Sequence, residues 1–280
     1  MSSLALTRIS GWPLLRRQVW AVMRLELAKG FSIIRSLWLF FLAFAPTLII
    51  GAHALKNRGC NLPEETLILA GIVQLFYTRF AIFFGCLGLS MRLLRGEVAE
   101  KTLHYAFLAP LRRELLIVGK FLAGALVAAV TFGGAVLACF ALMYGHFGAG
   151  RDFVVNGPGL AHLRAYLLVA VLASLGYSAA FLALSLVFKN PIVPAMVLLL
   201  CETFNGVLPV WLKRFSVTFY LKPLFPVELP SDGLFANLFT VVAEPTPPWL
   251  AVTGLLAFAG LVLAFACWRI RRFEVSYTTD

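Results

Sequence analysis

Charged residues are scarce in this chain of 280 residues. Asp, Glu, Lys and Arg make up 13% of the sequence and hydrophobic residues 61%, whereas a soluble domain carries roughly 25% charged residues. The mean hydropathy is +0.89. This composition excludes an ordinary soluble domain and is typical of a membrane protein.

Patterns that would indicate metal or catalytic chemistry are also missing. The sequence contains neither HExxH nor a CxxC pair, and it shows no cluster of cysteine and histidine at ligand spacing. It has no G-x-x-x-x-G-K-[ST] phosphate loop either, because Gly119–Lys120 lacks the upstream glycine and is followed by Phe121. We therefore expect no metal, no cofactor bound by this chain and no enzymatic activity of its own.

Long continuous apolar runs fill most of the chain, where a membrane β-barrel would show segments of about 10 alternating residues. A bilayer crossing takes roughly 20 residues, and an isolated span must satisfy its own backbone hydrogen bonds. The sequence therefore predicts an all-α integral membrane protein, a single domain over 1–280, with six transmembrane helices near 36–55, 67–94, 115–144, 161–188, 191–212 and 248–268.

Lysine and arginine set the expected orientation, because they concentrate on the cytoplasmic side of membrane proteins. With the N-terminus in the cytoplasm, 16 of the 24 Lys and Arg residues fall inside and seven outside, and Arg79 lies within a span. We expect a multi-pass protein of the cell membrane with both termini cytoplasmic and no cleaved signal. The net charge of +11 is dispersed, which argues against nucleic-acid binding.

Residues 12–35 are predicted to form an amphipathic helix that lies at the membrane surface. Arg17, Arg24 and Arg35 fall near one line of a helical wheel, and Trp12 and other apolar residues occupy the remaining surface. A basic helix bearing tryptophan is typical of an interfacial element. The alternative is a positively charged flank that only orients the first span.

Residues 95–114 form a charged segment between two apolar runs. Glu97, Glu100 and Lys101 share one face of a helix at spacings of three and four, and Leu103 and Phe107 form a separate i,i+4 pair before Pro110. Such a segment would lie at the membrane surface and offer side chains to a soluble partner. The alternative is an ordinary loop, although most helix–helix connections take only 2–8 residues.

The order Glu97–x–x–Glu100–Lys101–Thr102–Leu103, then Pro110, Arg113 and Gly119–Lys120, resembles the ABC type-2 permease family. Lys101 departs from that pattern, since the family often has glycine before the threonine. The resemblance implies that 95–114 is a coupling helix between spans 2 and 3, whose residues Glu97, Glu100, Lys101, Thr102, Leu103, Phe107, Pro110 and Arg113 contact an ATPase.

The resemblance also implies what the chain works with. We expect a separate ABC ATPase subunit that holds ATP and Mg, and a second permease subunit, identical or not, in the lipid membrane. The expected function is the transmembrane permease subunit of an ATP-driven exporter, which moves its substrate by alternating access. The alternatives are a membrane anchor or assembly scaffold that transports nothing and, less favoured, an intramembrane enzyme, which would need paired catalytic groups.

Residues 213–247 are apolar yet interrupted by proline. Backbone at membrane depth must be helical or buried in protein, so we expect short re-entrant or external helices, about 214–221 and 232–242, before the last span. Similar helices in type-2 permeases help to close the outer end of the pathway. The alternative is a loop that lies on lipid and gates nothing.

Two ionisable residues lie near the middle of predicted spans, Arg79 in the second and Glu202 in the fifth. A charge at that depth costs at least ~2.5–3.5 kcal/mol on insertion scales. We expect the two to form an intramembrane charged pair. The pair would either fix the packing of the helices or line the translocation pathway.

Overall fold

The computed structural model describes residues 12–30, 33–56, 61–100, 108, 111–204, 213–229 and 247–272. Within these ranges the regular structure is helical. The elements in chain order are α1 (Trp12–Gly30), α2 (Ile33–Lys56), α3 (Leu62–Gly71), η1 (Ile72–Ala81), α4 (Ile82–Ser90), η2 (Met91–Gly96), α5 (Glu97–Ala99), α7 (Arg113–Gly145), α8 (Gly148–Val155), α9 (Gly159–Val187), α10 (Ile192–Thr203), α12 (Val217–Leu221), η3 (Lys222–Leu224) and α14 (Pro248–Arg271).

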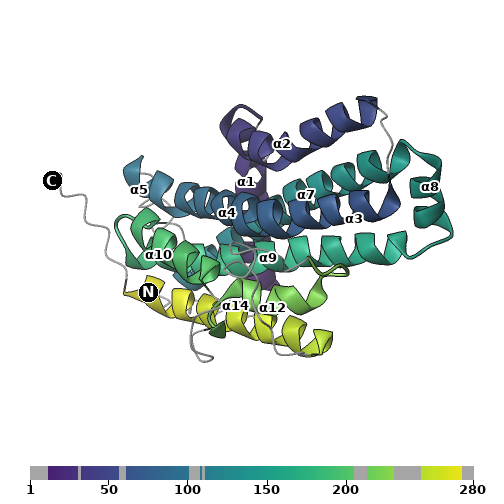
Figure 1. Ribbon diagram of the computed structural model, residues 1–280. Coiled ribbons are helices and arrows are strands. Elements are labelled where there is room, and N and C mark those ends of the chain that lie inside the picture. Colours follow the sequence, from purple (N-terminus) through teal and green to yellow (C-terminus); the bar gives the residue numbers. More distant parts are fainter. Residues whose placement is uncertain are drawn as a thin grey trace, which may run out of the picture.

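The described part of the chain has five helices long and apolar enough to cross a membrane: Ser36–Leu55, Leu62–Gly96, Arg113–Gly145, Gly159–Val187 and Pro248–Arg271. Figure 1 shows the long helices side by side, with α8 across one end of the bundle. The all-α membrane fold is therefore confirmed, and α7 lies at its centre, in contact with α1, α2, α9 and α14.

The fifth predicted span, 191–212, is represented among the described residues by α10 (Ile192–Thr203). This helix has 12 residues, which gives a length of only about 18 Å at 1.5 Å per residue, short of a hydrocarbon core of about 30 Å. Residues 205–212 lie outside the described ranges, so this fifth span, and with it the total of six spans, stays a prediction. Within the described chain, α10 ends after Thr203.

The second span is longer than predicted and contains two π-helical stretches. It runs without a break from α3 through η1, α4 and η2 into α5. Glycine is a weak helix former, yet Gly96 does not end this helix, and its backbone is helical, with φ −57° and ψ −47°. A π-helical turn shifts the hydrogen-bond pattern and often occurs at functional positions. The stretches η1 and η2 contain Arg79 and the end of the span, respectively.

The first span is fastened to its neighbours by hydrogen bonds. Pro46 lies inside α2 and cannot donate a backbone hydrogen bond. The Tyr77 hydroxyl donates to the carbonyl oxygen of Ala43 at 2.7 Å and lies 3.3 Å from Cys139 Sγ, which is 3.2 Å from Thr47 Oγ1. These contacts join α2, η1 and α7 in the core.

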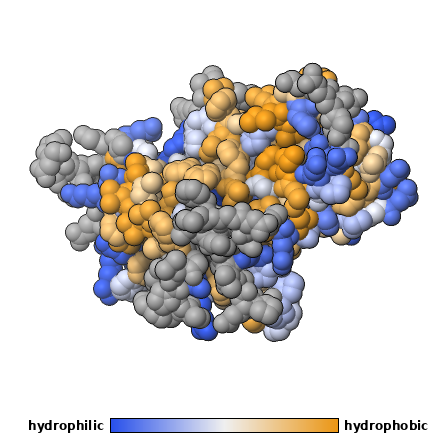
Figure 2. Space-filling model, viewed as in Figure 1, coloured by the Kyte–Doolittle hydropathy of each residue, from blue (hydrophilic) through white to orange (hydrophobic). Residues whose placement is uncertain are grey.

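The surface is widely apolar. Phe41 and Ile49 on α2 and Leu261 on α14 are each more than 70% exposed. Figure 2 shows broad hydrophobic areas over the long helices, with hydrophilic residues gathered toward both ends. A soluble monomer rarely exposes apolar patches of this extent, which agrees with a surface surrounded by lipid.

The N-terminal helix ends earlier than predicted. We expected one helix over 12–35, whereas α1 ends at Gly30 and Arg35 belongs to α2, the first span. Glycine has low helix propensity and permits a change of chain direction. Arg17 and Arg24 do lie on the same exposed side of α1. Figure 1 shows α1 lying across the long helices.

Candidate functional site: a buried charge cluster beside the coupling segment

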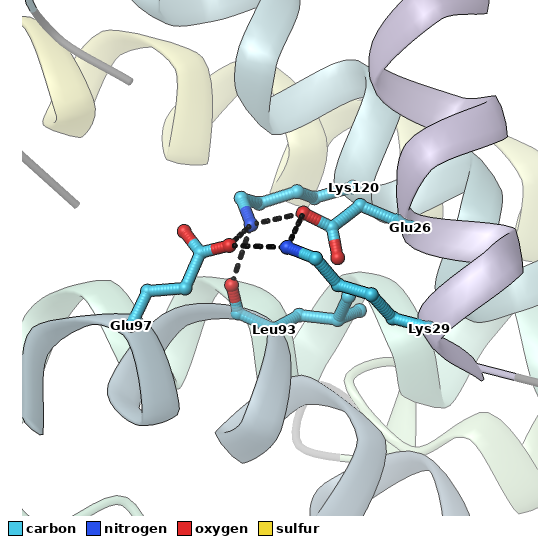
Figure 3. A network of polar contacts seen from close by, with 5 residues as sticks. All are labelled: Glu26, Lys29, Leu93, Glu97 and Lys120. Atoms are coloured by element: carbon cyan, nitrogen blue, oxygen red, sulfur yellow. Dashed lines mark hydrogen bonds and ion pairs between the residues drawn. The ribbon is translucent and has the colours of Figure 1, made fainter. Parts of the chain in front are cut away.

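A cluster of four charged side chains joins three helices near one end of the bundle (Figure 3). At its centre is Lys120 of α7, whose side chain is 0% exposed. The Lys120 ammonium lies 2.7 Å from Glu26 Oε1 and 2.8 Å from Glu97 Oε1. It also donates to the carbonyl oxygen of Leu93 at 2.8 Å. All three donor positions of the ammonium are therefore occupied by oxygen.

Lys29 of α1 completes the cluster from the exposed side. Its Nζ lies 3.3 Å from Glu97 Oε1 and 3.6 Å from Glu26 Oε1. Each carboxylate thus touches both ammonium groups, and the two positive and two negative charges cancel. A buried charge that lost its partners would be costly, so the cluster constrains α1, α5 and α7 relative to one another.

Gly119 brings α1 close enough to α7 for this cluster to form. A Cβ atom at Gly119 would lie 2.7 Å from both Val22 Cβ and Val22 Cγ1, and 3.2 Å from the Val19 carbonyl oxygen. Only glycine therefore permits this approach of the two helices. Glu26 follows Val22 by one helical turn, so the same face of α1 presents its carboxylate to Lys120.

The π-helical stretch η2 supplies the remaining acceptor. Leu93 lies within Met91–Gly96, where the hydrogen-bond pattern differs from that of an α-helix. Its carbonyl oxygen accepts from Lys120 of α7. The backbone at the end of the second span is therefore tied directly to the third span.

The cluster also sets the charge state of Glu97. Burial by itself would raise the pKa of this carboxyl, but the ammonium groups of Lys120 and Lys29 outweigh burial and hold the pKa of Glu97 below its ordinary value. Glu97 is therefore a carboxylate at neutral pH. Its side chain is 16% exposed.

The structure separates the residues predicted to contact an ATPase. Glu97 turns toward Lys120 and Lys29, whereas Glu100 and Arg113 are exposed. Lys101, Thr102, Leu103, Phe107 and Pro110 lie outside the described residues. The coupling role of the whole set stays a prediction, and Glu100 is the described carboxylate that a partner could reach.

Glu202 is fixed by the start of α12. Its carboxylate accepts hydrogen bonds from Ser216 Oγ at 2.8 Å, Val217 N at 2.8 Å and Thr218 N at 3.1 Å. The residue is 3% exposed. These bonds tie the end of α10 to a short helix that packs on α9 and α14.

Arg79 interacts electrostatically with Glu202 and Tyr177. The predicted pairing of Arg79 with Glu202 stays a prediction, since the hydrogen bonds that hold the Glu202 carboxylate come from Ser216, Val217 and Thr218. Arg79 lies in the π-helical stretch η1, on the second span. The structure therefore brings the two residues into one neighbourhood and adds α12 to it.

α12 enters the bundle rather than resting on its surface. A Cβ atom at Gly176, near the middle of α9, would lie 3.1 Å from Val217 Cγ1, and one at Gly254 of α14 would lie 2.6 Å from Tyr220. Gln74 Nε2 of η1 donates to the Val227 carbonyl oxygen at 2.7 Å. The sequence placed a short helix at about 214–221, and α12 occupies 217–221; residues 230–246, with the second predicted short helix, lie outside the described ranges.

A sequence model described as "ABC-2 family transporter protein" matches residues 20–228. The chain belongs to the ABC-2 transporter family. The match begins within α1 and extends to the segment after α12, so it includes the charge cluster and Glu202. A search of curated proteins finds no match to the chain.

Sequence reasoning missed part of the cluster in this ABC-2 family protein. Lys29 was counted only as a cytoplasmic charge, Lys120 was read as a cytoplasmic charge and as part of the family pattern, and Glu26 was not singled out. The available signals were an acidic residue one turn after Val22 on the apolar side of α1 and a lysine seven residues into an apolar helix. Neither signal identifies its partner, because the cluster residues lie up to 94 positions apart.

The described ranges contain no group of three or more His, Cys, Asp or Glu residues that could hold a metal ion. The charge cluster itself is unsuited to a cation, because Lys29 and Lys120 already occupy its carboxylates. Its arrangement fits a mechanical connection between helices, and we find no chemical step that it could perform.

Proposed function

We propose that this chain is the membrane subunit of an ATP-driven exporter and that a separate ABC ATPase, which holds ATP and Mg, docks on residues 95–114. The supporting observation is the buried cluster at the start of that segment. Glu97 is the first of the residues predicted to contact the ATPase, and its carboxylate contacts Lys29 of α1 and Lys120 of α7. Movement of the coupling segment would therefore act on both helices.

The transport cycle follows from this connection. Binding of ATP would close the ATPase dimer and draw the coupling segments of two permease subunits together. Because Glu97 is tied to Lys120, the cytoplasmic end of α7 would follow the coupling segment. Lys29 and Glu26 would carry α1 along, and the spans would tilt between inward and outward access. The chain itself would make and break no covalent bond.

The outer end of the pathway is proposed to be closed by the segment after α10. α12 packs within the bundle and is held by Glu202. Opening toward the outside would require α12 to move relative to α9 and α14. The hydrogen bonds of Glu202 and its interaction with Arg79 would then stabilise the state in which the pathway is closed to the outside.

The test uses surface charge reversal in the full complex. Tagged chain is purified from its own membranes, co-purifying ATPases are identified by mass spectrometry, and ATP hydrolysis by the complex is measured in vesicles. Glu100→Lys should weaken capture of the ATPase, because charge reversal at an interface opposes like charges. Asp152→Lys on α8, at the opposite end of the bundle, is the matched control.

Two results would contradict the proposal. One is purification of the intact chain without any ABC ATPase; the other is capture and hydrolysis that are the same for Glu100→Lys and the control. A membrane scaffold would be recognised differently. A scaffold would bind the ATPase but export nothing. The compounds released by the cells would therefore be the same whether or not the ATPase can hydrolyse ATP.

A further inference from the structure

A shallow hollow lies where the start of α7 meets the end of α14. It is lined by Leu111, Arg112, Arg113, Glu114 and Arg271. Three arginines against one glutamate give its lining a formal charge of +2. This hollow is separate from the charge cluster, because Lys120 at the centre of that cluster lies about two turns further along α7.

Contacts between the two helices build the hollow. Arg271 Nε lies 2.5 Å from Glu114 Oε1, and Cys267 Sγ donates to the Glu114 carbonyl oxygen at 3.9 Å. Glu114 is therefore engaged by α14. Arg112, the N-cap residue of α7, is exposed at the rim.

The level of the hollow in the membrane is marked by Trp268. This residue lies about one turn before Arg271 on α14, is 48% exposed, and has the Arg272 guanidinium 4.7 Å from its ring centroid. Exposed tryptophans of membrane helices sit at the level of the lipid headgroups. The start of α7 adds backbone amides and the positive end of the helix dipole at the same level.

We propose that this hollow binds the phosphate headgroup of an anionic phospholipid. The guanidinium group presents a planar fork of donors that matches the oxygens of a phosphate. Basic pockets between membrane helices on the cytoplasmic side suit anionic headgroups. A lipid held there would bridge α7 and α14 at the end of the predicted coupling segment, and the site stands whether or not the chain transports.

The test places a fluorescence probe at the hollow itself. The other five tryptophans, Trp12, Trp20, Trp38, Trp211 and Trp249, are changed to Phe, which leaves Trp268 as the reporter. The full chain is placed in phosphatidylcholine nanodiscs that contain the same small fraction of either brominated phosphatidylglycerol or brominated phosphatidylcholine. Stronger quenching by the brominated phosphatidylglycerol is the expected result.

Variants assign the preference to the hollow. Arg112→Gln/Arg113→Gln should abolish the difference between the two lipids, whereas Arg16→Gln/Arg24→Gln, which removes two exposed arginines from α1, should keep it. Leu111→Glu leaves every arginine in place and should abolish the difference by repulsion, so it replaces the double variant if that protein fails to fold.

Three results would overturn the proposal. The first is equal quenching by both lipids in the parent chain. The second is loss of the preference in the α1 control as well, which would indicate general attraction of basic residues to an anionic surface. The third is loss of the preference in excess inorganic phosphate at matched ionic strength, which would assign the hollow to a free anion.

Discussion

The ammonium group of Lys120 lies 2.7 Å from the carboxylate of Glu26, although 94 positions separate the two residues. This contact connects the helix that lies across the bundle to the central membrane helix. It also places Glu97, the first of the residues predicted to contact an ATPase, in the same cluster. The contact places α1 against the predicted coupling segment, whereas the sequence suggested only a surface helix.

Removal of Lys120 should destabilise the folded protein. Lys120→Met leaves the Glu26 and Glu97 carboxylates with Lys29 alone, and loss of one partner from a buried ion cluster typically costs ~3–5 kcal/mol. Lys120→Met/Glu26→Gln/Glu97→Gln should recover much of this loss, because no buried carboxylate then lacks its partner. Unfolding in detergent micelles measures both, with exposed Lys189→Met as the control. Equal stability of Lys120→Met and the control would refute the structural importance of the cluster.

Gly119 should resist even the smallest substitution. The Cβ atom of Gly119→Ala would meet Val22 at 2.7 Å, and overpacking of this kind costs ~1–3 kcal/mol. The matched control is Gly134→Ala on the same helix, where a Cβ meets nothing within 4 Å; it should stabilise by ~0.5–1 kcal/mol, the usual gain of alanine over glycine in a helix.

Val22→Gly supplies the complementary test of that close approach. It removes the atoms that Gly119→Ala would strike, so the double variant should be more stable than the sum of the two single effects predicts. Additive effects on the free energy of unfolding would mean that α1 does not pack on α7 at Gly119.

Acid should loosen the attachment of α1 to the coupling segment. The pKa of Glu97 is held below its ordinary value, so its contribution is complete above the ordinary pKa of a glutamate, about 4.3. That contribution is lost as the pH falls from there through the folded pKa, where Glu97 becomes protonated. A spin label at the exposed Arg24 position should report increasing mobility of α1 over that range.

Glu97→Gln serves as the reference for this titration. Glutamine cannot titrate, so the pH dependence of label mobility should become weaker than in the parent chain. An unchanged titration curve would assign the acid effect to a group other than Glu97.

Double-mutant cycles should show a stronger coupling of Glu202 to Ser216 than to Arg79. Glu202 accepts a hydrogen bond from Ser216 at 2.8 Å, and residues in direct contact couple by ~0.5–3 kcal/mol. The cycles use Glu202→Gln, Ser216→Ala and Arg79→Gln and compare free energies of unfolding. A larger coupling with Arg79 would instead support the intramembrane charged pair. Thr203→Ala/Ser216→Ala is the control cycle.

The sequence predicted the long helices well and their ends less well. Continuous apolar runs indicated where helices could cross a bilayer, and five of them form such helices. Gly30 and Gly96 show why boundaries were harder. Both glycines permit a break, yet α1 ends at Gly30 and the second span passes through Gly96. Neighbouring helices decide between these outcomes, and a local pattern contains no information on them.

The sequence by itself determined the membrane class, the five confirmed long helices and, through 95–114, a resemblance to the family to which the chain belongs. These features follow from apolar length and local spacing. Only the tertiary structure decided that Glu97 turns inward to Lys120 and that Glu202 holds the start of α12. The physical reason is that a buried charge must find its partner in space. Which partner it finds depends on close helix contacts, such as that of Gly119 with Val22, between segments far apart in the chain.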